Sequence, residues 1–142
     1  MLPSNKTMGN TFERRFCDLL FQHGFWAHNM AQTAAGQPAD VIAVKGQYHT
    51  LIDCKVVTGQ GFRFSRVEDN QRTAMDSFRE RGKEPCWFAL LLPGGDIQML
   101  SYETVKRMET MEDMHGLTIY QMPRYAYPFE RWLKIVNLEA NA

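Results

Sequence analysis

Residues 38–57 have the sequence PADVIAVKGQYHTLIDCKVV, in which two runs of apolar and β-branched residues flank a single glycine. This pattern predicts a strand over 38–44, a turn over 45–47 and a second strand over 48–57. If Gly46 and Gln47 form a two-residue turn, counting outward along the ladder places Asp40 directly across from Asp53. The stretch therefore predicts a β-hairpin that holds two carboxylates on one face, roughly 5 Å apart at Cβ.

Two like charges at that separation repel, so the arrangement requires a shared proton or a cation between the two aspartates. Lys55 lies two residues beyond Asp53 and points to the same side of the strand. A few carboxylate oxygens suit Mg²⁺ or Mn²⁺, and a divalent ion beside an ammonium suits the hydrolysis of phosphodiesters. The alternative is a surface Asp and Lys on an exposed strand edge. The apolar neighbours at 51–52 and 56–57 favour the metal site, because they are typical of a strand near the core.

The composition of the 142-residue chain, with 44% hydrophobic and 12% aromatic residues, predicts one compact domain with a true core. The three cysteines are widely spaced and form no CxxC pair, which favours reduced thiols in a cytoplasmic protein. Four scattered histidines and no HExxH motif count against zinc. The sequence has no apolar leader and no run of bilayer length, so we expect a soluble protein and no membrane partner.

The charges of the chain sum to zero but are unevenly distributed. Residues 1–83 carry 11 of the 16 Lys and Arg residues but only 8 of the 16 Asp and Glu residues. The half that contains the hairpin is therefore the basic half, which suits a polyanionic partner. A solvated surface of mixed charge is the alternative for each arginine taken alone.

Hydrophobic periodicity and capping residues predict a helix on each side of the hairpin. The first helix would begin at an N-cap, Asn10 or Thr11, and end at Gly24, with a short strand over 25–28 after it. The second would cover 65–81, where Ser65 and Glu68 have the spacing of a capping box and Gly82 ends the helix.

The remaining chain predicts more strands and helices. The apolar run 86–92 is typical of a central strand covered on both faces, and 97–102 predicts its neighbour. A helix over 103–114, a short strand over 117–120 and an amphipathic segment over 125–138 would follow. This order of elements predicts an α/β domain with a central mixed β-sheet flanked by α-helices.

These motifs together resemble a known family. The residues that carry the likeness are residues 9–16 (GNTFERRF), 38–40 (PAD), 52–55 (IDCK) and Asn70-Gln71. They resemble the PD-(D/E)xK nuclease superfamily and, within it, the Holliday-junction resolvases of the archaeal Hjc and bacterial RecU type, over roughly residues 9–105. The likeness implies a restriction-endonuclease-like fold and a single nuclease domain over 1–142. Residues 1–8 would be a flexible N-terminal arm and 115–142 a C-terminal extension.

The resemblance implies a role for each residue of the site. Asp40, Asp53 and the backbone carbonyl of Cys54 would hold the metal, and Glu13 would bind a second metal or a metal-bound water. Lys55 would be the catalytic lysine and Gln71 a supporting residue. Two alternatives stay open: Glu13 would close a capping box with Asn10, and Gln71 would be a solvated helix residue. The chain departs from the family pattern in two places, because Ala39 separates Pro38 from Asp40 and the second acid is Asp rather than Glu.

The resemblance also implies the substrate and the assembly. Residues 58–64 are too few for the protruding stalk of RecU proteins, so junction binding would depend on phosphate contacts by basic side chains. The candidates are Lys6, Arg14, Arg15, Arg63, Arg66 and Arg72. A two-fold homodimer suits the paired nicks that resolution of a four-way junction requires. Its candidate contacts are exposed apolar residues of the sheet edge or the C-terminal Tyr125, Tyr127, Phe129 and Trp132.

The expected protein is thus a Mg²⁺-dependent DNA endonuclease, with Mn²⁺ able to substitute, that resolves Holliday junctions. One alternative is another endonuclease of the superfamily, of the restriction, repair or phage DNA-degrading type. The other is a non-catalytic DNA-binding recombination accessory protein. The intact Asp40, Asp53 and Lys55 count against that second alternative, because a decayed site is expected to lose at least one of them.

Overall fold

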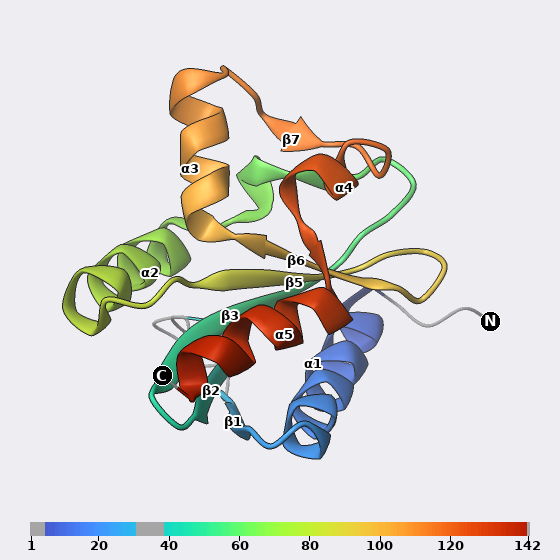
Figure 1. Cartoon of the computed structure of the whole chain (residues 1–142). Helices are drawn as coiled ribbons and strands as arrows, with labels where there is room; N and C mark the ends of the chain where they lie inside the picture. Colours follow the sequence, from blue (N-terminus) through green and yellow to red (C-terminus); the bar gives the residue numbers. More distant parts are fainter. Residues whose placement is uncertain (1–4, 31–38, 142) are drawn as a thin grey trace.

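The computed structural model describes residues 5–30 and 39–141, with side chains described from residue 8 onward (Figure 1). The helices are α1 (Asn5–Gln22), α2 (Asp69–Gly82), α3 (Tyr102–Met111), α4 (Met122–Tyr125) and α5 (Phe129–Ala140). The strands are β1 (Trp26–Asn29), β2 (Val41–Lys45), β3 (Tyr48–Val56), β4 (Phe62–Arg63), β5 (Trp87–Leu91), β6 (Ile97–Ser101), β7 (Gly116–Leu117) and β8 (Tyr127–Pro128). In the described part of the chain, no helix combines the length and the apolar character that a membrane span needs.

Six strands form the main sheet in the order β1-β2-β3-β5-β6-β8. The β3–β5 pair is parallel and the other neighbours are antiparallel, which confirms the predicted mixed sheet. Residues 86–92 were expected to form a central strand, and β5 does lie between β3 and β6. A separate two-stranded sheet joins β4 to β7.

The β2–β3 hairpin has the predicted register. Lys45 pairs with Tyr48 and Val41 with Ile52, so the next position outward places Asp40 opposite Asp53. Gly46 adopts φ +55°, the left-handed conformation that a glycine accepts without strain. The turn at Gly46-Gln47 therefore sets which residues of the two strands face each other.

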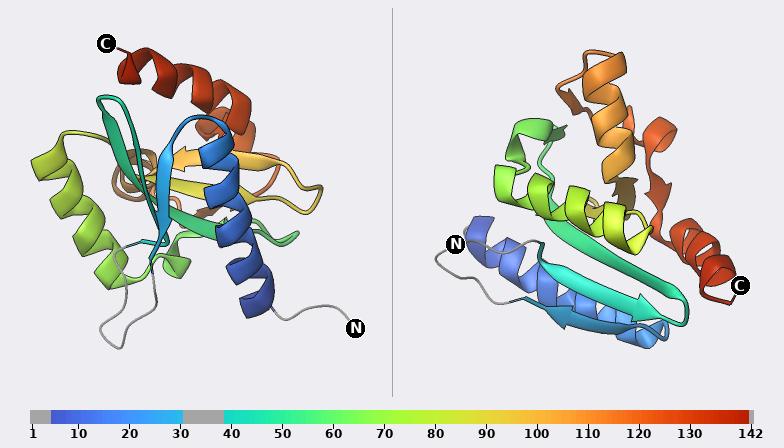
Figure 2. Two further views of the ribbon diagram at one scale, coloured as in Figure 1. Left: turned by 90° about the horizontal axis from the view of Figure 1, so that it is seen from below. Right: turned by 90° about the vertical axis from the view of Figure 1, so that its left-hand side faces the viewer.

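Helices cover both faces of the sheet (Figure 2). On one face, Phe16 and Leu20 of α1 and Trp132 and Val136 of α5 belong to one buried cluster together with Ile52 of β3. A second cluster joins the other face to α2, α3 and α4 and includes Met75, Val105, Met108 and Met122. The central strands are therefore buried on both sides, as their apolar sequences indicate.

The two helices next to the hairpin begin at other residues than predicted. The α1 helix already includes Asn5, so Asn10 and Thr11 are interior residues rather than caps, and residues 5–8 are helical rather than part of an arm. The α2 helix starts at Asp69 instead of residue 65, because its capping box is made by Glu68 and Gln71. Residues 64–66 form a separate 3-10 turn.

The C-terminal part contains more structure than the sequence predicted. Strand β7 pairs with β4 and strand β8 pairs with β6, although each is only two residues long. Phe129 and Trp132 were expected at a dimer contact, but their exposed fractions are 5% and 0%. Both rings belong to the core under α5, so that expectation is wrong for these two residues, whereas Tyr125 and Tyr127 are half-buried.

Candidate active site

The fold brings all five predicted catalytic residues to one pocket of about 470 Å³. Glu13 comes from α1, Asp40 from the residue before β2, Asp53 and Lys55 from β3, and Gln71 from the first turn of α2. We call Glu13, Asp40 and Asp53 the acidic cluster. The pocket thus joins residues from α1, the β2–β3 hairpin and α2.

Asp53 is the most enclosed of these residues, with an exposed fraction of 0%. Gln71 Nε2 donates a hydrogen bond of 2.9 Å to Asp53 Oδ1. Lys55 Nζ lies 2.9 Å from Asp53 Oδ2 and also donates to the carbonyl oxygen of Arg66 at 3.2 Å. Lys55 therefore lies on the same face of β3 as Asp53, as the two-residue spacing predicted.

Asp40 is held by the backbone of the facing strand. Its Oδ2 accepts a 2.7 Å hydrogen bond from the backbone N–H of Cys54, and its exposed fraction is 6%. This bond fixes the carboxylate at the end of the hairpin, beside Asp53. Cys54 lines the same pocket, as expected for the residue whose carbonyl was predicted to be a ligand.

The acidic cluster is electrostatically unfavourable in the absence of a cation. The pKa of Asp53 lies well above its ordinary value, first because burial disfavours the charged form and then because Asp40 is close, while Lys55 opposes the shift. Burial, the charge of Asp40 and a hydrogen bond with it raise the pKa of Glu13 to about 7, and Lys55 again acts in the opposite direction. The cluster therefore favours either bound protons or a bound cation.

The donor set fits a hard divalent cation. Asp53 Oδ2 meets the Lys55 ammonium as an ion pair but accepts no regular hydrogen bond, so this buried oxygen retains unused acceptor capacity. Within the described residues, no three acidic, histidine or cysteine side chains already form a coordination shell. The carboxylates form no such shell because each is held by other groups: Asp40 accepts from the Cys54 N–H, and Asp53 contacts Gln71 and Lys55. Binding of an ion would require these contacts to rearrange.

The alternative for Glu13 is excluded, because Asn10 lies inside α1 and caps no helix start there. The alternative for Gln71, a solvated position, is wrong as well, since its exposed fraction is 6%. Gln71 Oε1 accepts from the backbone N–H of Glu68 at 3.2 Å while its Nε2 reaches Asp53. One side chain therefore caps α2 and positions the buried carboxylate. The Glu-x-x-Gln spacing at 68–71 is a sequence signal for the cap alone and does not indicate the hydrogen bond to Asp53.

The predicted DNA-binding residues fall into different surroundings. Arg63 and Arg66 are exposed and line the pocket, and Arg66 also donates to the carbonyl oxygen of Val56 at 3.0 Å. Arg14 is exposed on α1, and Arg15 is exposed but lines a neighbouring groove. The side chain of Lys6 lies outside the described residues.

Arg72 does not line the pocket. Its guanidinium donates two hydrogen bonds, of 2.8 and 3.0 Å, to Glu109 of α3 and a third to the carbonyl oxygen of Phe64. A bidentate ion pair of this kind occupies the donors that a phosphate would need. Arg72 therefore joins α2 to α3, and its role in DNA binding stays a prediction.

Comparison with known proteins confirms the resemblance. A model of the archaeal Holliday junction resolvase (Hjc) family matches residues 4–135, which extends the likeness beyond the predicted 9–105. The structure of Archaeoglobus fulgidus Hjc, a Holliday junction resolvase from an archaeal hyperthermophile, is similar with a TM-score of 0.68 at 19% identity. The alignment covers 88% of this chain and 99% of the other, and it shows that the two share the restriction-endonuclease-like fold. No curated protein matches the chain.

Proposed function

Because the chain belongs to the archaeal Holliday junction resolvase family, we propose that it cuts four-way DNA junctions at the acidic cluster by Mg²⁺-dependent hydrolysis of phosphodiesters. Family membership makes the protein a Holliday junction resolvase, an endonuclease whose reaction uses a divalent metal. The observation that carries the proposal is the buried Asp53, held by Gln71 and paired with Lys55 inside an open pocket.

Asp40, Asp53 and the Cys54 carbonyl would hold the metal, with Glu13 at a second metal or at a water of the first. Mg²⁺ suits this set, because it commonly takes one or two carboxylates and keeps water and phosphate oxygens as its remaining ligands. Mn²⁺ is expected to substitute, since it prefers the same oxygen donors. When bound, the ion polarises the scissile phosphate and acidifies a water.

The surrounding side chains position the reactants. Gln71 keeps the Asp53 carboxylate in one orientation through its hydrogen bond to Oδ1. The ammonium of Lys55 lies at the pocket, where it would orient the attacking water or offset the charge that develops on the phosphate. Arg63 and Arg66 on the pocket rim would contact phosphates of the DNA backbone without base specificity, and Arg14 and Lys6 would extend this contact along α1.

The symmetry of a four-way junction also indicates how many copies of the protein act together. The substrate has two-fold symmetry and its resolution requires paired nicks on opposing strands. Two copies of the chain related by a two-fold axis would present one pocket to each strand, so we expect the active form to be a homodimer.

The test is cleavage of a labelled four-way junction, compared with linear duplex of the same sequence, in Mg²⁺ or EDTA. We expect wild-type protein to cut the junction in Mg²⁺ and not in EDTA. Asp53→Asn should lower the rate by on the order of a thousandfold or more, because it removes a ligand and charge from the site. Asp76→Asn is the matched control, since Asp76 is an exposed aspartate of α2 that does not line the pocket.

Each outcome decides a separate part of the proposal. Cutting in EDTA, or by Asp53→Asn at the wild-type rate, would refute the chemistry. Equal cutting of linear duplex and junction would refute the substrate and favour a general endonuclease. Junction binding without cutting in any divalent metal would favour the accessory-protein alternative.

A further inference from the structure

A second depression, of about 210 Å³, lies along the small sheet that β4 and β7 form. We call it the β7 hollow. Gln60 and Arg63 line both the hollow and the catalytic pocket, so the two depressions adjoin. The other polar residues that line the hollow are His115, Thr118 and Gln121. No Asp or Glu of the described chain lines it, so its charge suits an anionic chain that continues from the catalytic pocket.

Strand β7 is fixed closely against β4. Phe62 pairs with Leu117, and Arg63 pairs with Gly116. A methyl group built at Gly116 would lie 2.7 Å from the carbonyl oxygen of Phe62. One built at Gly61 would meet the carbonyl oxygen of Leu117. The two backbones are thus in direct contact, and Gly61 and Arg63 also line the catalytic pocket. The turn that follows β7 therefore has a fixed position relative to that pocket.

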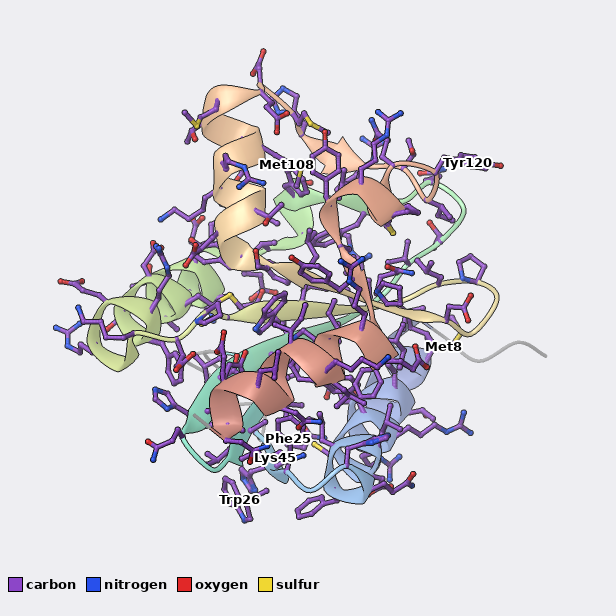
Figure 3. The ribbon with its side chains drawn as sticks, viewed as in Figure 1. Met8, Phe25, Trp26, Lys45, Met108 and Tyr120 are labelled. Carbon is purple, nitrogen blue, oxygen red and sulfur yellow. The ribbon has the colours of Figure 1, made fainter. Side chains whose placement is uncertain are left out.

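This turn, residues 118–121, carries an exposed aromatic side chain between two anchored ends. Thr118 N donates to Gln121 Oε1 at 2.9 Å, and Gln121 N donates to Thr118 Oγ1 at 3.2 Å, so the ends of the turn hold each other. Ile119 packs against the buried cluster on this face of the sheet, and Met122 is fully buried. Between these anchors Tyr120 is 93% exposed and points away from the molecule (Figure 3).

An exposed aromatic ring beside a basic hollow combines the two parts of a site for a nucleic acid strand. An aromatic ring stacks on any base, because every base has a π-face, and a cationic side chain binds the phosphates. Arg63 is exposed, and none of the ion pairs in the described chain involves it. His115 instead has Asp113 at 3.8 Å. The phosphate contact therefore belongs to Arg63.

We propose that Tyr120 and the β7 hollow form a second DNA-contact site, in which the tyrosine ring stacks on a base exposed at the branch point of a junction. The proposal rests on the proposed function, because the strand in the hollow is the one that passes through the catalytic pocket. The bases inside a linear duplex are covered by their neighbours, whereas stacking is interrupted where four arms meet. Tyr120 thus distinguishes branched from linear DNA, and Arg63 binds the phosphates of both.

The test compares binding of a labelled four-way junction with binding of a linear duplex of the same sequence, by fluorescence anisotropy in EDTA. Tyr120→Ala should weaken junction binding about tenfold and change duplex binding by less than about twofold, because it removes one base stack. Tyr120→Phe keeps the ring and should bind the junction as wild type does. Arg63→Ala should weaken binding of both DNAs alike and reduce its salt dependence.

A junction with 2-aminopurine at the branch point gives a direct signal, because the fluorescence of this base falls when a ring stacks on it. The probe is placed at each branch-point position in turn. Wild type and Tyr120→Phe should quench it at one of these positions, and Tyr120→Ala should not.

Trp26→Ala is the matched control. Trp26 is an aromatic residue of β1 that is 56% exposed and lines neither depression, and Figure 3 shows it at the opposite end of the molecule from Tyr120. The control should bind both DNAs and quench the probe as wild type does. Thermal scans check the folding of every variant, and those of Tyr120 should melt with wild type because its side chain lies in water.

Each outcome separates this inference from the proposed function. Junction binding and quenching by Tyr120→Ala at the wild-type level would overturn the inference and leave the endonuclease in place. Equal losses for junction and duplex would overturn the role of Tyr120 in recognising the branch. A wild type that binds both DNAs equally would overturn the proposed substrate and this inference together, whereas the chemistry is still decided by cleavage with Asp53→Asn.

Discussion

Two sets of charged residues in this protein are arranged in opposite ways: one places like charges close together, and the other pairs opposite charges. The acidic cluster gathers the half-buried Glu13 with the buried Asp40 and Asp53, and burial and repulsion raise the pKa of Asp53. Helices α2 and α3 instead carry opposite charges that pair at the surface. Arg72 binds Glu109 and Lys106 binds Asp76, each at 2.8 Å, and Arg79 pairs with Glu103. We call these three pairs the ion-pair ladder.

The difference shows where electrostatics serves stability and where it serves chemistry. In the ion-pair ladder each charged side chain is paired with an opposite charge on the other helix. Removing one pair should therefore change only a small part of the folding free energy. The acidic cluster leaves like charges close together, which costs stability until a proton or a cation arrives. The cluster is therefore unfavourable for the apo fold and suited to binding a metal.

After loss of the Asp53 carboxylate, loss of Lys55 should have the largest effect on cleavage, because Lys55 is, among the described residues, the pocket cation that pairs with a carboxylate of the acidic cluster. We expect Lys55→Ala to reduce junction cleavage at saturating Mg²⁺ by on the order of a hundredfold or more. Loss of this ammonium also removes an interaction that lowers the pKa of Asp53. Single-turnover rates of wild type, Lys55→Ala and the exposed-residue control Lys134→Ala measure the effect. A rate within twofold of wild type would contradict the assignment.

Glu13 should make the cluster sensitive to pH. Its pKa rises on folding from 4.5 to about 7, so its stabilising contribution is complete below about 4.5 and is lost as the pH rises through about 7. Glu13→Gln should remove this loss, and its stability relative to wild type should increase across that window. Because Mg²⁺ requires the ionised carboxylate, wild-type Mg²⁺ affinity should fall below pH 7. Denaturant titrations and calorimetry from pH 4.5 to 8 test both statements.

Neutralising one aspartate in each region should give opposite signs of stability change. Without metal, Asp53→Asn should stabilise the fold at pH 8, because it removes a buried carboxylate whose pKa is raised by burial and by Asp40. Asp76→Asn should instead destabilise it slightly, since it breaks the pair with Lys106. Mg²⁺ should raise the melting temperature of wild type and Asp76→Asn but not of Asp53→Asn. A loss of stability in both variants would refute the contrast.

The smallest effects are expected in the ion-pair ladder. Lys106→Ala should cost about 0.5 kcal/mol, and Arg72→Ala about 1 kcal/mol because its pair is bidentate and partly buried. Both losses should shrink in 1 M salt, which screens surface pairs. Urea titrations at low and high salt measure them, with Arg107→Ala on the exposed side of α3 as the control. Losses that are unchanged by salt would indicate packing rather than charge.

The hairpin could be predicted because its information is local. The apolar and β-branched runs on both sides of the glycine at 46 determine the register, and the register determines that Asp40 and Asp53 meet. The parallel pairing of β3 with β5 and the burial of Trp132 depend on contacts between distant parts of the chain. Two-residue strands such as β7 and β8 are too short for any periodicity to indicate them.

The sequence predicted which residues form the candidate site, but not the hydrogen bonds and ion pairs that hold their side chains. The D-x-K spacing was sufficient to place Lys55 beside Asp53. The start of α2 was misplaced because Ser65 and Glu68 matched a capping box that Glu68 and Gln71 in fact form. The hydrogen bond from Gln71 to Asp53 and the engagement of Arg72 by Glu109 both depend on how α2 sits on the fold, which spacing alone does not specify.

The turn at Gly46 has a consequence for how this enzyme tolerates change. A methyl group built at Gly46 would lie 2.5 Å from the carbonyl oxygen of Ala140, and Gln47 N donates to that same oxygen at 3.3 Å. The last turn of α5 thus packs directly against the turn of the hairpin and leaves no room for a side chain at position 46. A larger residue at 46 would displace either the C-terminal helix or the strand alignment, so a mutation distant from the chemistry would misalign the aspartates that perform it.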